Sequence, residues 1–329
     1  VELEKEFDEY KDISSYLATI DPTSVLLLQT VCLLDGVISK KALLPKMINH
    51  DNFNTHSRDA VTLIDLACNF LSNNLGFGLS KTDKLIPHPT TVVTLAIVWK
   101  FLKDSEKENE SDVKRHLEKW IIHSTLSKRY TEGSQTKMEK DARELVKYFK
   151  ELFRGNNPDY PECFKFEGLT SDILYTIPSS AQGRLVRSFF NLQKPRDPLK
   201  FDNRVYYDES YSEPQEHHIW PKKFLKGIPG WTEDKEANNV LNIMFVTAET
   251  NKEFDSLNPA DQLQLIEQKV PEEARRQEIF KANFLSPRCI ELMKKPNKNR
   301  EDYIDFLNAR HEIIVDYLNN YFGIENSNN

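Results

Sequence analysis

Apolar residues recur at helical spacing through the first half of the chain, and this pattern constrains the fold more than any other feature. Ala60, Ile64, Ala67 and Leu71 follow one another at intervals of three or four residues. Such spacing places side chains on one face of a helix, which is buried against other helices. The same pattern predicts helices over 25–34, 57–75, 90–103, 112–129 and 136–153. We therefore predict a helical domain over residues 1–155.

A second domain is predicted over residues 156–329. The segment 156–166 contains two prolines and little periodicity, so it is interpreted as a linker. Beyond it, apolar spacing predicts helices over 180–192, 259–269, 271–280 and 300–322. The run Asn242–Thr247 has the strongest strand signal of the chain, and 202–207 is a weaker one. The chain has only 10 glycines, which disfavours Rossmann-type and glycine-rich β architectures.

Charge and cysteine content limit the class of protein. The net charge is −7, so a nucleic-acid contact requires a local basic face. The four cysteines are far apart and form no CxxC pair, which argues against a cysteine zinc site and fits a reduced, cytoplasmic protein. The longest apolar stretch, Val92–Trp99, is too short to cross a bilayer, so we expect no membrane contact.

One segment combines residues that suit phosphodiester chemistry. The sequence reads Glu-His-His-Ile-Trp-Pro-Lys-Lys from residue 216, and Asn242 and Asn251 follow on either side of the predicted strand. A histidine with an ordinary pKa near 6.5 is largely neutral in cells and can accept a proton from water. An imidazole and an amide oxygen can together hold a divalent cation. That ligand set suits Mg²⁺ or Mn²⁺, and the imidazole extends it to Ni²⁺, Co²⁺ or Zn²⁺.

These residues resemble a known nuclease motif. The run His217 to Pro221, followed by Asn242 and Asn251, looks like the HNH, or ββα-metal, motif. The His-x-x-Pro form resembles the C-terminal nuclease domain of GmrSD-type restriction endonucleases, which are bacterial defence proteins. The resemblance is strong over about 180–260 and weaker over the helical first half. It implies a mainly α fold, in which the second, mostly helical domain encloses a small ββα-metal motif.

The resemblance also implies a role for each residue of the motif. His218 matches the general base, and Asn242 matches the asparagine that braces the loop carrying that base. His217 and Asn251 match the two protein ligands of the metal. Family members usually have Glu or Asp at the position of His217. From the ordinary pKa of histidine we expect activity to rise from about pH 5.5 to 7.5.

A basic segment surrounds the motif. Residues 180–226 hold nine bases and six acids, so their net charge of +3 reverses that of the whole chain. Such a reversal is expected of a face that follows a phosphate backbone. The predicted nucleic-acid contacts are Lys222, Lys223, Arg184, Arg187 and Lys252. A solvated basic helix face is the alternative for the two arginines.

We thus expect a metal-dependent endonuclease of a restriction or phage-defence system, acting on modified or phage DNA. The family's nucleotide-binding module, with its Asp-Gly-Gln-Gln-Arg signature, is absent from this sequence. We expect nucleotide binding to be carried out by another domain or by a partner subunit. The alternative from another class is a non-catalytic nucleic-acid-binding or regulatory module of a larger defence complex. An RNA nuclease is a third possibility, because the motif selects neither sugar nor base.

Overall fold

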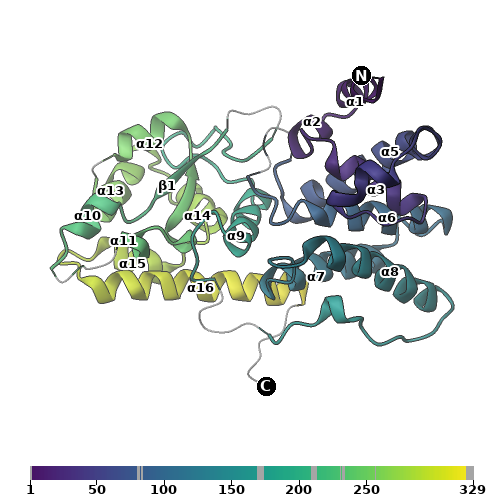
Figure 1. Ribbon diagram of the computed structural model, residues 1–329. Helices are drawn as coiled ribbons and strands as arrows, with labels where there is room; N and C mark the ends of the chain where they lie inside the picture. The colour runs from purple at the N-terminus through teal and green to yellow at the C-terminus, as the bar shows by residue number, and fades with distance from the viewer. Residues whose placement is uncertain are drawn as a thin grey trace. The chain divides into compact units, whose positions relative to one another are not determined.

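The computed structural model describes residues 2–79, 82, 84–168, 174–208, 213–229, 231, 234–255 and 257–323, and of these it does not describe the side chains of 2–6 and 234–235. The chain divides into two compact units, residues 1–167 and 168–329 (Figure 1). The described part is mainly helical and contains one small two-stranded antiparallel sheet. The predicted fold class is therefore confirmed.

The first unit is built from helices. Its elements are α1 (Glu2–Ile13), α2 (Leu17–Ile20), α3 (Val25–Leu34), η1 (Lys41–Leu43), α4 (Leu44–Met47), α5 (His50–Leu75), α6 (Thr90–Asp104), α7 (Ser111–Leu126), α8 (Ser134–Phe153) and η2 (Glu162–Phe164). Helix α6 packs against α3, α5 and α8. This central position explains the apolar run Val92–Trp99, because a helix covered on several sides is apolar around most of its circumference.

Residues 156–166 are not a linker, and the first unit ends after Glu167 rather than after Gly155. Cys163 and Phe164 are buried within the unit. The Phe164 carbonyl lies 2.7 Å from His123 Nδ1, and the Tyr160 ring stacks on Tyr148. The segment lacks helical periodicity because single aromatic side chains, rather than a helix face, fix it to α7 and α8.

The second unit carries the sheet and the remaining helices. Its elements are α9 (Ala181–Leu192), β1 (Gln215–His218), α10 (Lys222–Lys226), α11 (Asp234–Ala237), η3 (Val240–Asn242), β2 (Ile243–Val246), α12 (Ala248–Phe254), α13 (Pro259–Lys269), α14 (Glu273–Ala282), α15 (Pro287–Lys294) and α16 (Arg300–Phe322). The long helix α16, yellow in Figure 1, contacts α15 and η3. Trp220, which follows β1 in the chain, forms a buried aromatic cluster with Tyr303 and Phe306 of α16.

Some details of the second unit differ from the sequence predictions, among them the short helices α10 and α11. Residues 202–207 form no strand. Instead the segment turns back on itself, with an isolated bridge between Arg196 and Arg204. Helix α15 was not predicted, because its eight residues are too short for a clear periodic pattern. The predicted strand at 242–247 is confirmed as β2, with all four residues buried.

The described residues include no helix that is both long and apolar enough to cross a bilayer. All four cysteines are buried free thiols.

Candidate active site

The two strands and α12 place the predicted motif residues close together. Strand β1 pairs antiparallel with β2, so that His217 lies opposite Met244 and His218 lies opposite Ile243. Helix α12 begins directly after β2, where the Thr247 hydroxyl accepts a hydrogen bond from the Thr250 backbone N–H and caps the helix. The resulting strand–strand–helix order is the arrangement that the resemblance implies.

The His217 side chain is buried between α12 and α13, with 6% of the residue exposed. Its Nδ1 lies 2.9 Å from Asn251 Oδ1, and its Nε2 lies 3.3 Å from Gln262 Oε1. The ring also contacts Phe254, with 5.0 Å between ring centroids. Burial lowers the pKa of His217 below its usual value, which favours the neutral imidazole that a metal ion binds.

His217 and Asn251 fit a divalent cation. Neighbouring ligands of an octahedral ion lie about 3 Å apart when each bond is about 2.1 Å long. The 2.9 Å between Nδ1 and Oδ1 matches that spacing. One nitrogen and one oxygen donor suit Mn²⁺ or Mg²⁺, each of which keeps several further water or phosphate ligands, and Ni²⁺, Co²⁺ or Zn²⁺ as well.

His218 lies at the last position of β1 and lines an open hollow of about 460 Å³. Its Nε2 is 3.3 Å from Asn238 Oδ1, just before η3. Burial, and to a smaller extent the nearby charge of Lys222, lowers the pKa of His218 to about 4. The imidazole is therefore neutral at pH 7 and has a lone pair available to accept a proton.

Asn242 makes the contacts expected of a residue that braces the loop after His218. Its Oδ1 accepts from the Trp220 backbone N–H at 2.8 Å, and its Nδ2 donates to the Trp220 carbonyl at 2.9 Å and the Ala237 carbonyl at 3.1 Å. The residue is fully buried. These three hydrogen bonds join the backbone at Trp220 to that at Ala237, and Asn242 itself is not among the residues that line the hollow.

Two buried charged residues hold the ends of β2. The Arg310 guanidinium on α16 donates to the carbonyls of Leu241 and Ile243, and also to those of Asn283 and Phe284. At the other end, the Asp197 carboxylate accepts from the Thr247 N–H at 2.8 Å and the Thr250 hydroxyl at 2.6 Å.

Neither Arg310 nor Asp197 was recognised in the sequence as part of the site. Both are charged side chains that are fully buried, and their bonds reach backbone groups across the unit. They position Asn242 and the helix that carries Asn251.

Three of the predicted basic residues surround the hollow. Lys222, Lys223 and Lys252 are exposed, and all three line it together with Asp255. Lys223 also lines an adjoining hollow of about 570 Å³, whose wall includes Lys298. Basic side chains therefore line both the hollow that contains the histidines and the hollow next to it.

The predictions for the two arginines fit the structure less well. Arg187 is 4% exposed, donates to the Pro178 carbonyl and forms a salt bridge of 2.6 Å with Glu216. The prediction that it contacts nucleic acid is therefore wrong, because the side chain is enclosed in the core. Arg184 donates to the Ser179 carbonyl and is not among the residues that line the hollow. Glu216, the partner of Arg187, is half-buried.

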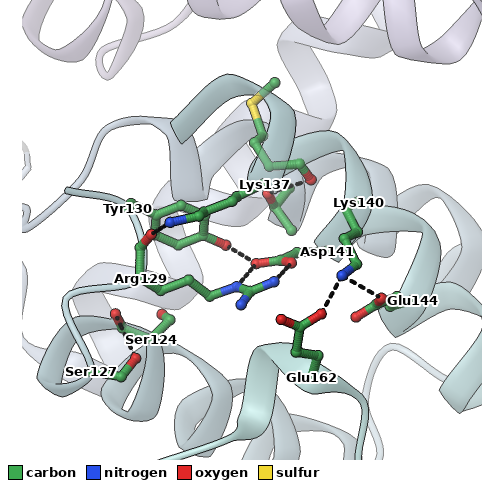
Figure 2. A network of polar contacts seen from close by, with 11 residues as sticks. Ser124, Ser127, Arg129, Tyr130, Lys137, Lys140, Asp141, Glu144 and Glu162 are labelled. Carbon is green, nitrogen blue, oxygen red and sulfur yellow. Dashed lines mark hydrogen bonds and ion pairs between the residues drawn. The ribbon is translucent and has the colours of Figure 1, made fainter. Parts of the chain in front are cut away.

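A second cluster with metal-binding atoms lies in the first unit, where Asp141, Glu144 and Cys163 come together. Figure 2 shows that the Asp141 carboxylate is already occupied. It accepts two hydrogen bonds from Arg129, at 2.6 and 2.7 Å, and one from Tyr130 at 2.6 Å. Burial raises the pKa of the Cys163 thiol, so this thiol is protonated when no metal is bound. This cluster fits a structural network rather than a metal site.

Gln262 is a further site residue that the sequence analysis does not identify, and it contacts a motif histidine directly. It lies on α13, on the same buried face as Leu263 and Ile266. The signal was a polar amide at a position that the helix pattern assigns to the core. Such a side chain requires hydrogen-bond partners, and here one of them is His217.

Comparison with known proteins finds a distant relative of the chain. The chain is similar to the uncharacterized protein MJ0686 of Methanocaldococcus jannaschii, with 26% identity over an alignment of 345 residues. The alignment covers 95% of this chain and 54% of that protein, so the chain spans about half the length of its relative. No protein-family model and no solved structure matches the chain. The function therefore has to be inferred from the residues of the site.

Proposed function

We propose that this protein is a metal-dependent endonuclease with an HNH-type site, related to the GmrSD-type restriction endonucleases. One observation carries the proposal: His217 Nδ1 and Asn251 Oδ1 lie at the spacing of two ligands of one ion, beside a hollow that His218 also lines. The strand–strand–helix order of β1, β2 and α12 supports it, because it is the element order of that motif.

His218 acts as the general base. Its neutral imidazole takes a proton from the attacking water, and the contact with Asn238 orients the ring. Asn242 fixes the loop after His218, so that the base keeps its position relative to the hollow. The general base and the residue that fixes its loop are thus both supplied by this chain.

His217 and Asn251 bind the cation. When bound, a divalent ion stabilises the negative charge that develops on the phosphate and on the leaving oxygen. Mg²⁺ or Mn²⁺ is the proposed cofactor, with Ni²⁺, Co²⁺ or Zn²⁺ as further candidates. Phosphate oxygens and water would occupy the other coordination positions.

DNA is the proposed substrate, in a restriction or phage-defence role that takes modified or phage DNA. Lys222, Lys223 and Lys252 are exposed around the hollow, where they can contact phosphates on either side of the cleaved bond. Lys298, in the adjoining hollow, extends this basic surface. By the resemblance, a nucleotide-binding domain or partner subunit would act together with the nuclease.

A plasmid assay tests this proposal. Supercoiled DNA is incubated with the protein in Mg²⁺, in Mn²⁺ and in EDTA, and nicked and linear products are separated on a gel. We expect cleavage that needs the metal and that His218→Ala abolishes, whereas His50→Ala, at an exposed histidine on α5, cleaves at the wild-type rate. DNA binding without cleavage in any metal would instead favour a non-catalytic binding module. Cleavage of RNA alone would change the substrate class.

A further inference from the structure

Gln262 is fully buried on α13 and faces His217 from the side away from Asn251. Its Nε2 donates to the Leu257 carbonyl at 3.2 Å. Its Oε1 is 3.3 Å from His217 Nε2. A buried amide is costly unless both of its ends are paired, so these two contacts account for a glutamine at a core position.

The contact with Leu257 determines which end of the Gln262 amide meets the histidine. A carbonyl oxygen can only accept, so the NH₂ group of Gln262 must point to Leu257. The reversed amide would place two oxygens against each other and leave its NH₂ group beside the imidazole. Gln262 Oε1 therefore faces His217, and it needs a donor there.

Asn251 Oδ1 can likewise only accept, so a neutral His217 can donate to only one of the two oxygens. The Gln262 amide is fixed by its bond to Leu257, whereas the half-exposed Asn251 can turn its amide and donate its NH₂ group to Nδ1 when no cation is bound. The donor to Gln262 is therefore the Nε2–H group of His217.

An imidazole that binds a metal is neutral and carries a single N–H. If that hydrogen is on Nε2, the lone pair is on Nδ1, which lies 2.9 Å from Asn251 Oδ1. Asn251 is half-exposed and lines the hollow, whereas Gln262 is enclosed in the core. The lone pair thus lies on the side that substrate and solvent can reach.

We propose that Gln262 is a positioning residue, which holds His217 in the Nε2–H tautomer and so directs its Nδ1 lone pair to the cation shared with Asn251. The inference rests on the proposed metal site and adds the residue that prepares it. A ligand histidine commonly donates its second ring N–H to an oxygen, and loss of that partner typically weakens metal binding about 10- to 100-fold. A core glutamine that only bonds to Leu257 would have no such effect.

The test uses the full chain and three variants. Gln262→Met removes both hydrogen bonds, and Gln262→Glu keeps an oxygen acceptor for His217 but loses the donor to Leu257. Gln268→Met is the matched control, because Gln268 is an exposed glutamine of the same helix. Thermal melting shows that each variant is folded. The Mn²⁺ dissociation constant is measured by calorimetry, and the ring tautomer of His217 by ¹⁵N NMR without metal.

We expect wild type to show the Nε2–H tautomer. Gln262→Met should show a mixture of tautomers and bind Mn²⁺ about 10- to 100-fold more weakly. Gln262→Glu should keep the tautomer and bind Mn²⁺ within a few-fold of wild type, and the control should not change.

An Nδ1–H tautomer in wild type, or wild-type Mn²⁺ affinity in a folded Gln262→Met, would overturn this inference and leave the proposed function standing. The wild-type tautomer can be measured even if Gln262→Met does not fold. A wild-type chain with no affinity for Mn²⁺ would overturn the proposed metal site itself.

Discussion

Asn242 forms two hydrogen bonds with the backbone of a single residue, Trp220: its Oδ1 accepts from the N–H at 2.8 Å and its Nδ2 donates to the C=O at 2.9 Å. The two bonds resemble those of a paired strand residue, and they fix the chain two residues after His218. The base is therefore held from both sides, by β1 pairing before it and by a side chain after it.

The first prediction follows from this pair of bonds. Asn242→Asp keeps the acceptor for the Trp220 N–H, but it loses both Nδ2 bonds and places a buried acid against two carbonyl oxygens. We expect the free energy of unfolding to fall by about 3 kcal/mol or more, measured by urea titration. Asn239→Asp is the control, because the hydrogen bond of the Asn239 side chain within the described residues uses its Oδ1, as an acceptor for the Leu241 N–H. Equal losses in the two variants would contradict the bracing role.

The second prediction concerns Arg310. Arg310→Met leaves four backbone carbonyls without a donor and removes the ring contact with Phe190. Because each buried acceptor left unsatisfied costs about 1–3 kcal/mol, we expect the free energy of unfolding to fall by about 3 kcal/mol or more. Arg288→Met, at a half-exposed arginine on α15, should change it by less than about 0.5 kcal/mol. A similarly small effect of Arg310→Met would mean that the stability of β2 does not depend on the hydrogen bonds of Arg310.

The third prediction replaces the pH dependence expected from the sequence. An ordinary histidine would give activity that rises from about pH 5.5 to 7.5. With the pKa of His218 lowered to about 4, the proton-accepting form is already dominant at pH 5.5. The part of the cleavage rate that depends on His218 should therefore rise between about pH 3 and 5 and be flat from 5.5 to 7.5. Single-turnover cleavage across this range checks the prediction, and an NMR titration of the ring in the metal-free protein gives its pKa directly.

The helices and the motif could be predicted from the sequence because both depend on local information. Apolar spacing identified α6, α13 and α16, and the short interval from β2 to α12 placed Asn251 near the histidines. Arg187 is a residue for which local sequence information gives the wrong prediction. Its charge predicts exposure, but the chain encloses it and pairs it with Glu216. Partners distant in sequence, such as Arg310 and Leu241, leave no local pattern, because only the tertiary fold brings them together.

The fourth prediction tests the basic rim of the hollow. Lys222→Ala combined with Lys223→Ala should weaken binding to all DNA sequences alike and lower the salt-dependence slope by up to about two. The physical reason is that two exposed ammonium groups would no longer displace counterions from the phosphates. Binding is measured by fluorescence anisotropy at several salt concentrations in a His218→Ala background. Lys150→Ala with Lys281→Ala, two exposed lysines that do not line the hollow, is the control. An unchanged slope would place the DNA elsewhere.

The last prediction concerns the metal ligand at His217. His217→Ala should lose cleavage in every metal, because water would take the vacated coordination position and the cation would bind more weakly. His217→Asp supplies a hard oxygen, so we expect it to keep cleavage with Mg²⁺ and to lose any advantage with Ni²⁺ or Co²⁺.

The buried position of His217 adds a second, independent measurement. An unpaired carboxylate at this buried position lowers stability, whereas a bound cation neutralises it. Mg²⁺ should therefore raise the melting temperature of His217→Asp more than that of wild type, and should leave that of His217→Ala nearly unchanged. If wild type, His217→Ala and His217→Asp show the same change of melting temperature with Mg²⁺ and the same cleavage rate, His217 does not bind the metal.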